Sequence, residues 1–242
     1  MENEHFWSLV IEPGFVQSAV WTIEGESTRV LSVGPASAWE DETDLVTVTD
    51  TALSATVQNL PEESQEPSKT VFGVPPSWVT DGQISRDHLD KIRKLCSELS
   101  LSPTGFVVLP EAIAHFIKSE EGAPLNAVVI GVSKSSLEVT LFKLGNLAGS
   151  VSVGRSISTV DDVLESLSRF GSSDLLPSRF LLYGGNSTEL EDIRQNLLSA
   201  DWTHDFADKV KFLHAPQIEI IDSEKKMLAV CLAGASEIGK VS

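Results

Sequence analysis

Cationic side chains are scarce in this sequence, and their scarcity excludes several classes of partner. The 242 residues include 18 lysines and arginines against 35 aspartates and glutamates, a formal net charge of −17. A field of that sign repels the phosphates of nucleic acids and the anionic headgroups of lipids. We therefore expect neither nucleic acid nor an anionic lipid surface to bind this chain directly.

Cysteine and histidine are also sparse. Cys96 and Cys231 lie far apart in apolar helical patterns, and neither has the close Cys or His neighbours of a zinc site. The five histidines show no paired spacing, and there is no Walker loop and no Gly-x-Ser-x-Gly motif. These absences disfavour a zinc protein, a P-loop nucleotidase and an α/β-hydrolase. We expect both thiols to be reduced and buried.

Long apolar runs are missing as well. No stretch approaches the roughly 18 apolar residues of a membrane span, and the first five residues are acidic where a signal peptide is basic. Apolar residues nevertheless make up 41% of the chain, an ordinary proportion for a globular core. The sequence therefore predicts a soluble, cytoplasmic protein without a transmembrane segment.

The first half of the chain begins with a predicted hairpin. Pro13-Gly14 separates two β-branched and aromatic runs, Phe6–Glu12 and Phe15–Glu24, and Thr28–Val33 is a third strand. The other elements expected in this half are a helix within Asp41–Asn59, an exposed loop at Pro61–Lys69, a strand at Thr70–Val74, a helix at Ser85–Ser100, a strand at Gly105–Leu109 covered on both faces, and a helix from Pro110 to Lys118.

The same order begins again after Gly122-Ala123-Pro124. The elements expected there are strands at Asn126–Val132, Leu137–Lys143 and Gly149–Arg155, a helix at Thr159–Phe170, a strand at Phe180–Tyr183, a helix at Glu189–Leu198, a strand at Val210–Leu213 with an optional extension over Ile218–Ile221, and a helix at Glu224–Ala233 that stops at Gly234. Each half then reads β-β-β-α-β-α-β-α. We predict an α/β fold with two tandem halves, residues 1–122 and 123–242, each with a mixed five-stranded sheet.

The doubled order resembles the actin-like ATPases, whose halves are ribonuclease H-like. Leu9–Gly14 resembles the first phosphate turn of that group, Val128–Ser133 the second, and Leu182–Ser187 the adenosine motif. Glycines at such places let backbone amides approach phosphate oxygens. The resemblance implies ATP and magnesium as ligands, held by Glu12, Gly14, Gly131, Ser133, Gly184, Gly185 and Asn186, with Glu12 reaching the metal through water. Plain hairpins, and a tight turn with Ser187 as a helix N-cap, are the alternatives.

Several departures from the group's pattern weaken its chemistry. Val129 stands where the second turn would carry an acid, and Leu109 replaces a polar residue in the connecting motif Leu109–Ala114. Phosphoryl transfer depends on positioning and on electrostatic stabilisation, so losing these groups disfavours hydrolysis. The large inserted subdomains are also missing, since only Trp39–Thr70 and Gly171–Ser178 could hold them. We expect that neither ATP nor magnesium is retained.

Within the group, residues 71–117 look most similar to the type IV pilus assembly protein PilM and to the cell-division protein FtsA. The resemblance implies a bacterial pseudo-ATPase: a scaffold, peripheral to the inner membrane through protein partners, in a pilus, secretion or division assembly. A slow ATPase that uses Glu12 and Glu111, with bound ATP and magnesium as a conformational switch, is the alternative. The chain could also be one domain of a longer protein. Its oligomeric state is not readable, although the missing subdomains argue against filaments.

Overall fold

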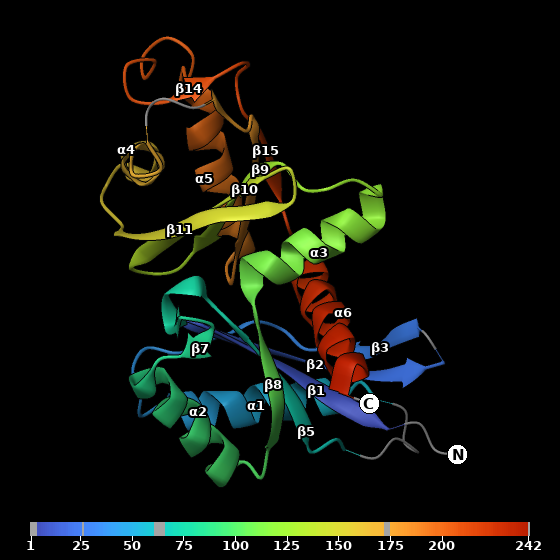
Figure 1. Cartoon of the computed structure of the whole chain (residues 1–242). Coiled ribbons are helices and arrows are strands. Elements are labelled where there is room, and N and C mark those ends of the chain that lie inside the picture. Colours follow the sequence, from blue (N-terminus) through green and yellow to red (C-terminus); the bar gives the residue numbers. More distant parts are fainter. Residues whose placement is uncertain (1–3, 26, 61–65, 172–174, 242) are drawn as a thin grey trace. The chain divides into compact units, whose positions relative to one another are not determined.

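The computed structural model describes residues 4–25, 27–60, 66–171 and 175–241 (Figure 1). Contacts divide the chain into two compact units, residues 1–116 with 223–242, and residues 117–222. This division differs from the consecutive ranges 1–122 and 123–242. The reason is that the last helix, α6 (Ser223–Val241), packs on the first sheet, so that the two chain ends belong to one unit.

The first unit is built on a mixed sheet. Its main strands lie in the order β3-β2-β1-β5-β8. Their bounds are β1 His5–Glu12, β2 Phe15–Glu24, β3 Ser27–Val33, β5 Lys69–Val74 and β8 Ser102–Val108. The first three form antiparallel pairs, whereas β5 runs parallel to β1 and β8 parallel to β5. Short β4 (Ser37–Ala38) pairs with β2, and β6 (Val79–Thr80) and β7 (Gln83–Ile84) form a separate hairpin.

Helices cover both faces of this sheet (Figure 1). On one face, Trp7, Leu9 and Ile11 of β1 pack in a core with α1 (Leu45–Val57) and α2 (Arg86–Glu98). On the other face lies α6. Because side chains alternate along a strand, the residues of β1 between these three point toward α6. Glu12 belongs to that second set, and this places its carboxylate against the last helix rather than in the first core.

The second unit repeats the arrangement. Its strands lie in the order β11-β10-β9-β13-β15, the same order along the chain as in the first sheet. Its elements are β9 Ala127–Val132, β10 Ser136–Lys143, β11 Asn146–Gly154, α4 Thr159–Ser168, β12 Leu175–Leu176, β13 Arg179–Gly184, α5 Ser187–Ser199, β14 Lys211–Phe212 and β15 Gln217–Ile220. The remaining helix, α3 (Leu109–Glu121), runs across the boundary between the units. The predicted α/β fold with two mixed five-stranded sheets and no large insertions is confirmed.

Three details of the prediction are wrong. The fifth strand of the second sheet is the optional extension, β15, whereas β14 pairs with β12 outside that sheet. β8 begins at Ser102, three residues before the expected start at Gly105, and its residues 102–105 are exposed at the edge of the sheet. The last helix does not stop at Gly234 but continues to Val241. Gly234 is a contact position: a Cβ there would lie 3.0 Å from Cγ1 of Val71, so the glycine lets α6 approach β5 closely. Residues 61–65 of the expected loop lie outside the described residues.

Candidate functional site

The first phosphate-type turn lies between β1 and β2. Gly14 has a φ angle of 89°, in the left-handed region that favours glycine. Trp39 covers this turn with two hydrogen bonds: its backbone N–H donates to the carbonyl oxygen of Gly14 (3.0 Å), and its indole Nε1–H donates to the carbonyl oxygen of Glu12 (3.1 Å). These two main-chain oxygens are therefore already bonded within the unit.

The carboxylate of that turn is buried and paired. Glu12 is only 4% exposed, and its Oε2 accepts a hydrogen bond from Nζ of Lys226, which is 1% exposed. Lys226 lies in the first turns of α6, on the face that packs on the sheet. Removing one partner of such a pair would leave an uncompensated charge away from water. The pair therefore ties the end of β1 to the last helix.

At the second phosphate-type turn, the Tyr183 side chain of the same unit occupies the space beside Gly131. Gly131 of β9 lies opposite Tyr183 of β13, and a Cβ added at Gly131 would lie 2.5 Å from Oη of Tyr183. The glycine makes room for the phenol ring. Ser133 closes its own turn, since its hydroxyl donates to the carbonyl oxygen of Ser136 (3.0 Å) and accepts from that residue's N–H (3.0 Å). Val129 is fully buried in the sheet.

The adenosine-type residues follow the neighbouring strand. Gly184 ends β13 beside Val132, and an added Cβ would lie 2.7 Å from the carbonyl oxygen of Val132. Gly185 is half-buried, and the Asn186 side chain accepts a hydrogen bond from the Glu189 N–H (3.2 Å), so Asn186 is the N-cap of α5. These residues and Gly131 share the carboxyl ends of two adjacent parallel strands, the usual place for ligands in open α/β sheets.

The connecting motif places its two notable residues differently. Leu109 is the first residue of α3 and is fully buried; its Cδ2 atom would lie 3.2 Å from a Cβ at Gly73 of β5. Glu111, two residues later, lines a hollow with β8 and α6, and partial burial raises the pKa of its carboxyl. Leu109 is thus a core residue, and Glu111 is the member of this motif with an ionisable group in a cavity.

No protein-family model matches the chain, and neither does any curated protein. Solved structures do match. A chain of the PilM–PilN type IV pilus biogenesis complex has a TM-score of 0.61 at 10% identity, covering 94% of this chain and 98% of that one. The ethanolamine utilization protein EutJ from Carboxydothermus hydrogenoformans has a TM-score of 0.58 at 9% identity, with 96% and 89% covered.

A Bacteroides thetaiotaomicron protein, described as having an actin-like ATPase fold and unknown function, matches with a TM-score of 0.55 at 9% identity. The match covers 95% of this chain and 96% of that protein. This chain has the actin-like ATPase fold. Identities this low show the fold alone, and they assign neither an activity nor a partner.

The actin-like ATPase fold typically binds ATP and magnesium, and the first turn of this member does not fit a magnesium ion as it is arranged. Magnesium demands a nearly octahedral set of oxygen ligands, including waters. The carboxylate of Glu12 is instead held by the ammonium of Lys226 in a dry environment. Among the described residues, no group of three or more His, Cys, Asp or Glu side chains could hold a metal ion.

In the part of the chain that the structure describes, no helix is both long and apolar enough to cross a bilayer.

The expected site residues of the second unit lie at or just after the carboxyl ends of β9 and β13. They are Gly131, Ser133, Gly184, Gly185 and Asn186. Glu12 and Gly14 lie together in the first unit.

Sequence reasoning missed Lys226, Tyr183 and Arg155. A lysine four residues before Val230, on the apolar face of the last helix, was a detectable signal for a buried ion pair. Arg155 bridges the turn after β9 and the first turn of α5, because its Nη1 donates both to the carbonyl oxygen of Ser133 (2.8 Å) and to Oε1 of Glu189 (2.6 Å). Nothing local in the sequence indicates that contact.

Proposed function

We propose that this protein is an actin-fold scaffold that binds protein partners and does not turn over ATP appreciably. The observation that supports this proposal is the buried ion pair between Glu12 and Lys226. Glu12 is the one acid that the phosphate-type turns retain. With its charge neutralised by an ammonium from the same unit, Glu12 offers no free carboxylate to a hydrated metal ion.

The free energy needed to separate Glu12 from Lys226 also argues against metal binding at this turn. Freeing Glu12 for a metal would leave the ammonium of Lys226 buried without a partner. Breaking a buried pair in this way typically costs about 3–5 kcal/mol. A magnesium ion would have to recover that energy while also losing part of its own hydration shell. Metal-dependent catalysis at this turn therefore begins with a large disadvantage.

The other catalytic positions support a loss of chemistry too. Val129 and Leu109 are fully buried core residues, and the space beside Gly131 holds the ring of Tyr183. The side chains of Val129 and Leu109 have no polar group with which to position an attacking water or stabilise developing charge on a phosphate. The contacts of these turns thus lie within their own units, at Trp39 in the first and at Tyr183 in the second.

The proposed partners are proteins of a membrane-associated assembly of the pilus, secretion or division type. One structural relative belongs to a complex named for PilM, PilN and type IV pilus biogenesis. The net charge of −17 disfavours nucleic acid and anionic lipid as direct ligands. We propose that the protein works in the cytoplasm and reaches the inner membrane through its partners.

The test measures ATP binding by calorimetry and phosphate release in the presence of magnesium. We expect no release above that of a buffer control. Phosphate release by the wild-type protein that is lost in the double variant Glu12→Gln with Lys226→Met would overturn the proposal. That variant buries no net charge, so the loss would show that the carboxylate is catalytic.

A slow ATPase that uses bound nucleotide as a switch is the second candidate. One observation favours it: burial raises the pKa of Glu111, which is the direction that a general base near neutral pH requires. In that case Glu111→Gln would abolish phosphate release. Glu120→Gln, which changes an exposed glutamate of the same helix, would leave it intact.

A further inference from the structure

Strand β8 leaves one edge of the first sheet open. It pairs with β5 and with no other described strand, so outward-facing N–H and C=O groups along it have no strand partner. Pro103 lacks an N–H and the register shifts between Thr70 and Val71 opposite it, which restricts regular pairing to the part from Gly105 to Val108. An open edge of this kind is a template for an added strand.

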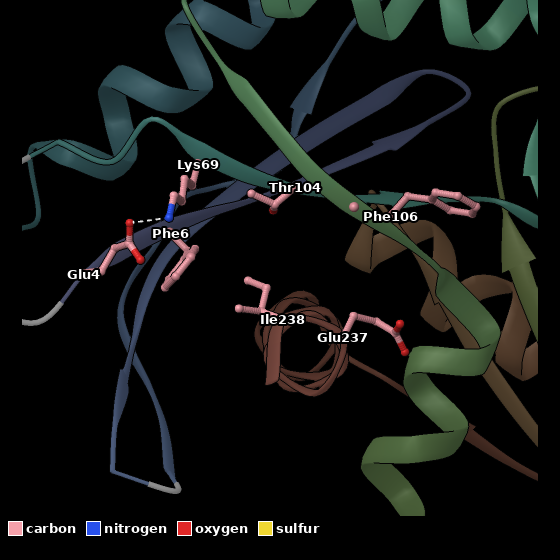
Figure 2. Close-up of a pocket in the computed structure, with 8 residues that line it drawn as sticks. Glu4, Phe6, Lys69, Thr104, Phe106, Glu237 and Ile238 are labelled. Carbon is pink, nitrogen blue, oxygen red and sulfur yellow. Dashed lines mark ion pairs between the residues drawn. The ribbon is translucent and has the colours of Figure 1, made fainter. Parts of the chain in front are cut away.

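A cavity of about 510 Å³ lies beside the same stretch, between the face of the sheet and α6. Besides β8 and α6, it is lined by Glu4, Phe6 and Lys69, and the ammonium of Lys69 is paired with Glu4 (2.6 Å). Figure 2 shows Ile238 pointing from α6 toward the strand, with Phe6 at the side of the space. A Cβ added at Gly105 would meet no atom within 4 Å, so there is open space beside this residue. A volume of this size accommodates a large apolar side chain together with part of its backbone.

A second hollow of about 630 Å³ continues along β8, and the two share Phe106 and Glu237 as lining residues. Glu111 of α3 lines this second hollow. No described residue forms an ion pair with its carboxylate, including His115, which lines the hollow one helical turn later. The raised pKa of Glu111 has burial as its cause. A cation supplied by a ligand would therefore meet an acid that lacks a counter-charge.

We propose that this groove, formed by Gly105–Val108 of β8 together with the facing side of α6, binds an extended basic segment of a partner protein. The segment adds a strand to the open edge of β8. It places an apolar side chain in the cavity beside Gly105 and a lysine or arginine against Glu111. The proposal names the partner chemistry of the scaffold function proposed above and rests on it.

The negative charge of the chain favours a basic peptide over a second copy of this chain or a nucleic acid as the ligand of the groove. The whole chain carries −17, so a second copy would bring a like-charged surface, and a nucleic acid would bring phosphates to an acidic groove. The two adjoining hollows follow a strand, a shape that fits an extended peptide. Four paired residues at about 3.3 Å each span about 13 Å, so the part of the segment that pairs with β8 is about four residues long.

The test is a selection of random nine-residue peptides on the full chain, followed by affinity measurement of the enriched peptides by fluorescence polarisation. We expect enriched peptides to carry an apolar residue and a lysine or arginine at a constant spacing. Gly105→Leu should weaken them by about tenfold or more, because the leucine fills the cavity. Gly154→Leu, at a glycine of β11 that also has open space, should leave affinity unchanged.

Glu111→Lys supplies a second variant. The Glu111 side chain lines an open hollow and stays accessible to solvent, so this change does not put folding at risk. It should reverse the preference from basic to acidic peptides. Hydrogen exchange with bound peptide should slow at residues 105–108, as expected for an added strand. Failure to enrich any peptide, equal binding to Gly105→Leu, or a dimer in sedimentation that Gly105→Leu dissolves would each overturn the proposal.

The peptide-binding experiments and the ATP-hydrolysis experiments test the two proposals separately. ATP turnover by the wild-type protein would refute the absence of hydrolysis, yet it leaves peptide binding at β8 to be judged by its own affinities. Conversely, unaltered peptide binding by Gly105→Leu would refute the groove while leaving the buried Glu12 and its consequence for hydrolysis unchanged.

Discussion

Glu12 and Lys226, which lie 214 residues apart in the chain, form a buried ion pair that joins the first strand to the last helix. Two opposite charges that are excluded from water stabilise each other only when both are present. The pair therefore has two consequences, one for the ligand chemistry of the first turn and one for the stability of the first unit.

Lys226→Met should destabilise the protein by about 3–5 kcal/mol, because it strands the charge of Glu12 in the interior. Adding Glu12→Gln to this variant should restore most of the loss, since the double variant buries no net charge. Urea unfolding followed by circular dichroism measures both. Lys94→Met, the same change at an exposed lysine of α2, is the control and should change the free energy of unfolding little. Equal stability of the single and double variants would contradict the pairing.

Gly131→Ala should destabilise the second unit by about 1–3 kcal/mol, because its Cβ would overlap the ring of Tyr183. A smaller residue opposite should relieve the overlap. We expect Gly131→Ala with Tyr183→Leu to be less destabilised than the sum of the two single changes. A thermodynamic cycle from thermal or urea unfolding measures this coupling, and strictly additive losses would show that the ring does not occupy the glycine's space.

Cys231 is fully buried, and burial raises the pKa of its thiol to about 12 from an ordinary 9.0. In the unfolded chain this thiol ionises near the ordinary value, so the unfolded state binds fewer protons at high pH. The contribution of Cys231 to stability should therefore fall as pH rises from about 9 toward 12. Comparing the pH dependence of unfolding with that of Cys231→Ala measures this contribution.

The same burial predicts the order of thiol reactivity. Cys96 is half-buried, whereas Cys231 is not accessible at all. A thiol reagent added to the native protein should modify Cys96 first and should reach Cys231 only on unfolding. Rapid modification of both thiols in the native state would contradict the placement of Cys231 in the interior of the first unit.

Asn186→Ala should cost about 1 kcal/mol, because the side chain caps the N–H of Glu189 at the start of α5. Asn186→Asp should preserve the cap, since a negative charge there also complements the helix dipole. Thermal unfolding measures both changes. Ser187→Ala is the matched control and should be nearly neutral; a larger loss at Ser187 would show that the cap had been assigned to the wrong residue.

The doubled order of elements could be predicted because each strand and helix carries a local pattern. Turn residues such as Pro13 and Gly14 separate apolar runs, and that signal requires no knowledge of distant residues. The end of the last helix could not be predicted in this way. From the local sequence, Gly234 indicates the end of a helix. Only its closeness to Val71 shows that it is a contact position within the helix.

The strand-end positions of the candidate glycines could be predicted, whereas their contacts could not, and their role as a ligand site stays a prediction. The turns with Gly14, Gly131 and Gly184 lie at strand ends, as their flanking apolar runs indicate. A sequence can show that a glycine is present, although it does not show whether backbone, ligand or side chain fills the space beside it. At Gly131 the space holds the ring of Tyr183, which belongs to another strand.

By itself, the sequence determined the α/β class, the repeated order of strands and helices, and the acidic character that disfavours nucleic acid. These properties follow from composition and local periodicity. The tertiary structure alone decided that Glu12 is neutralised by Lys226, that β8 has an open edge and that Glu111 lies in a hollow. Each of these depends on which distant segments meet, because burial and pairing are properties of the packed chain.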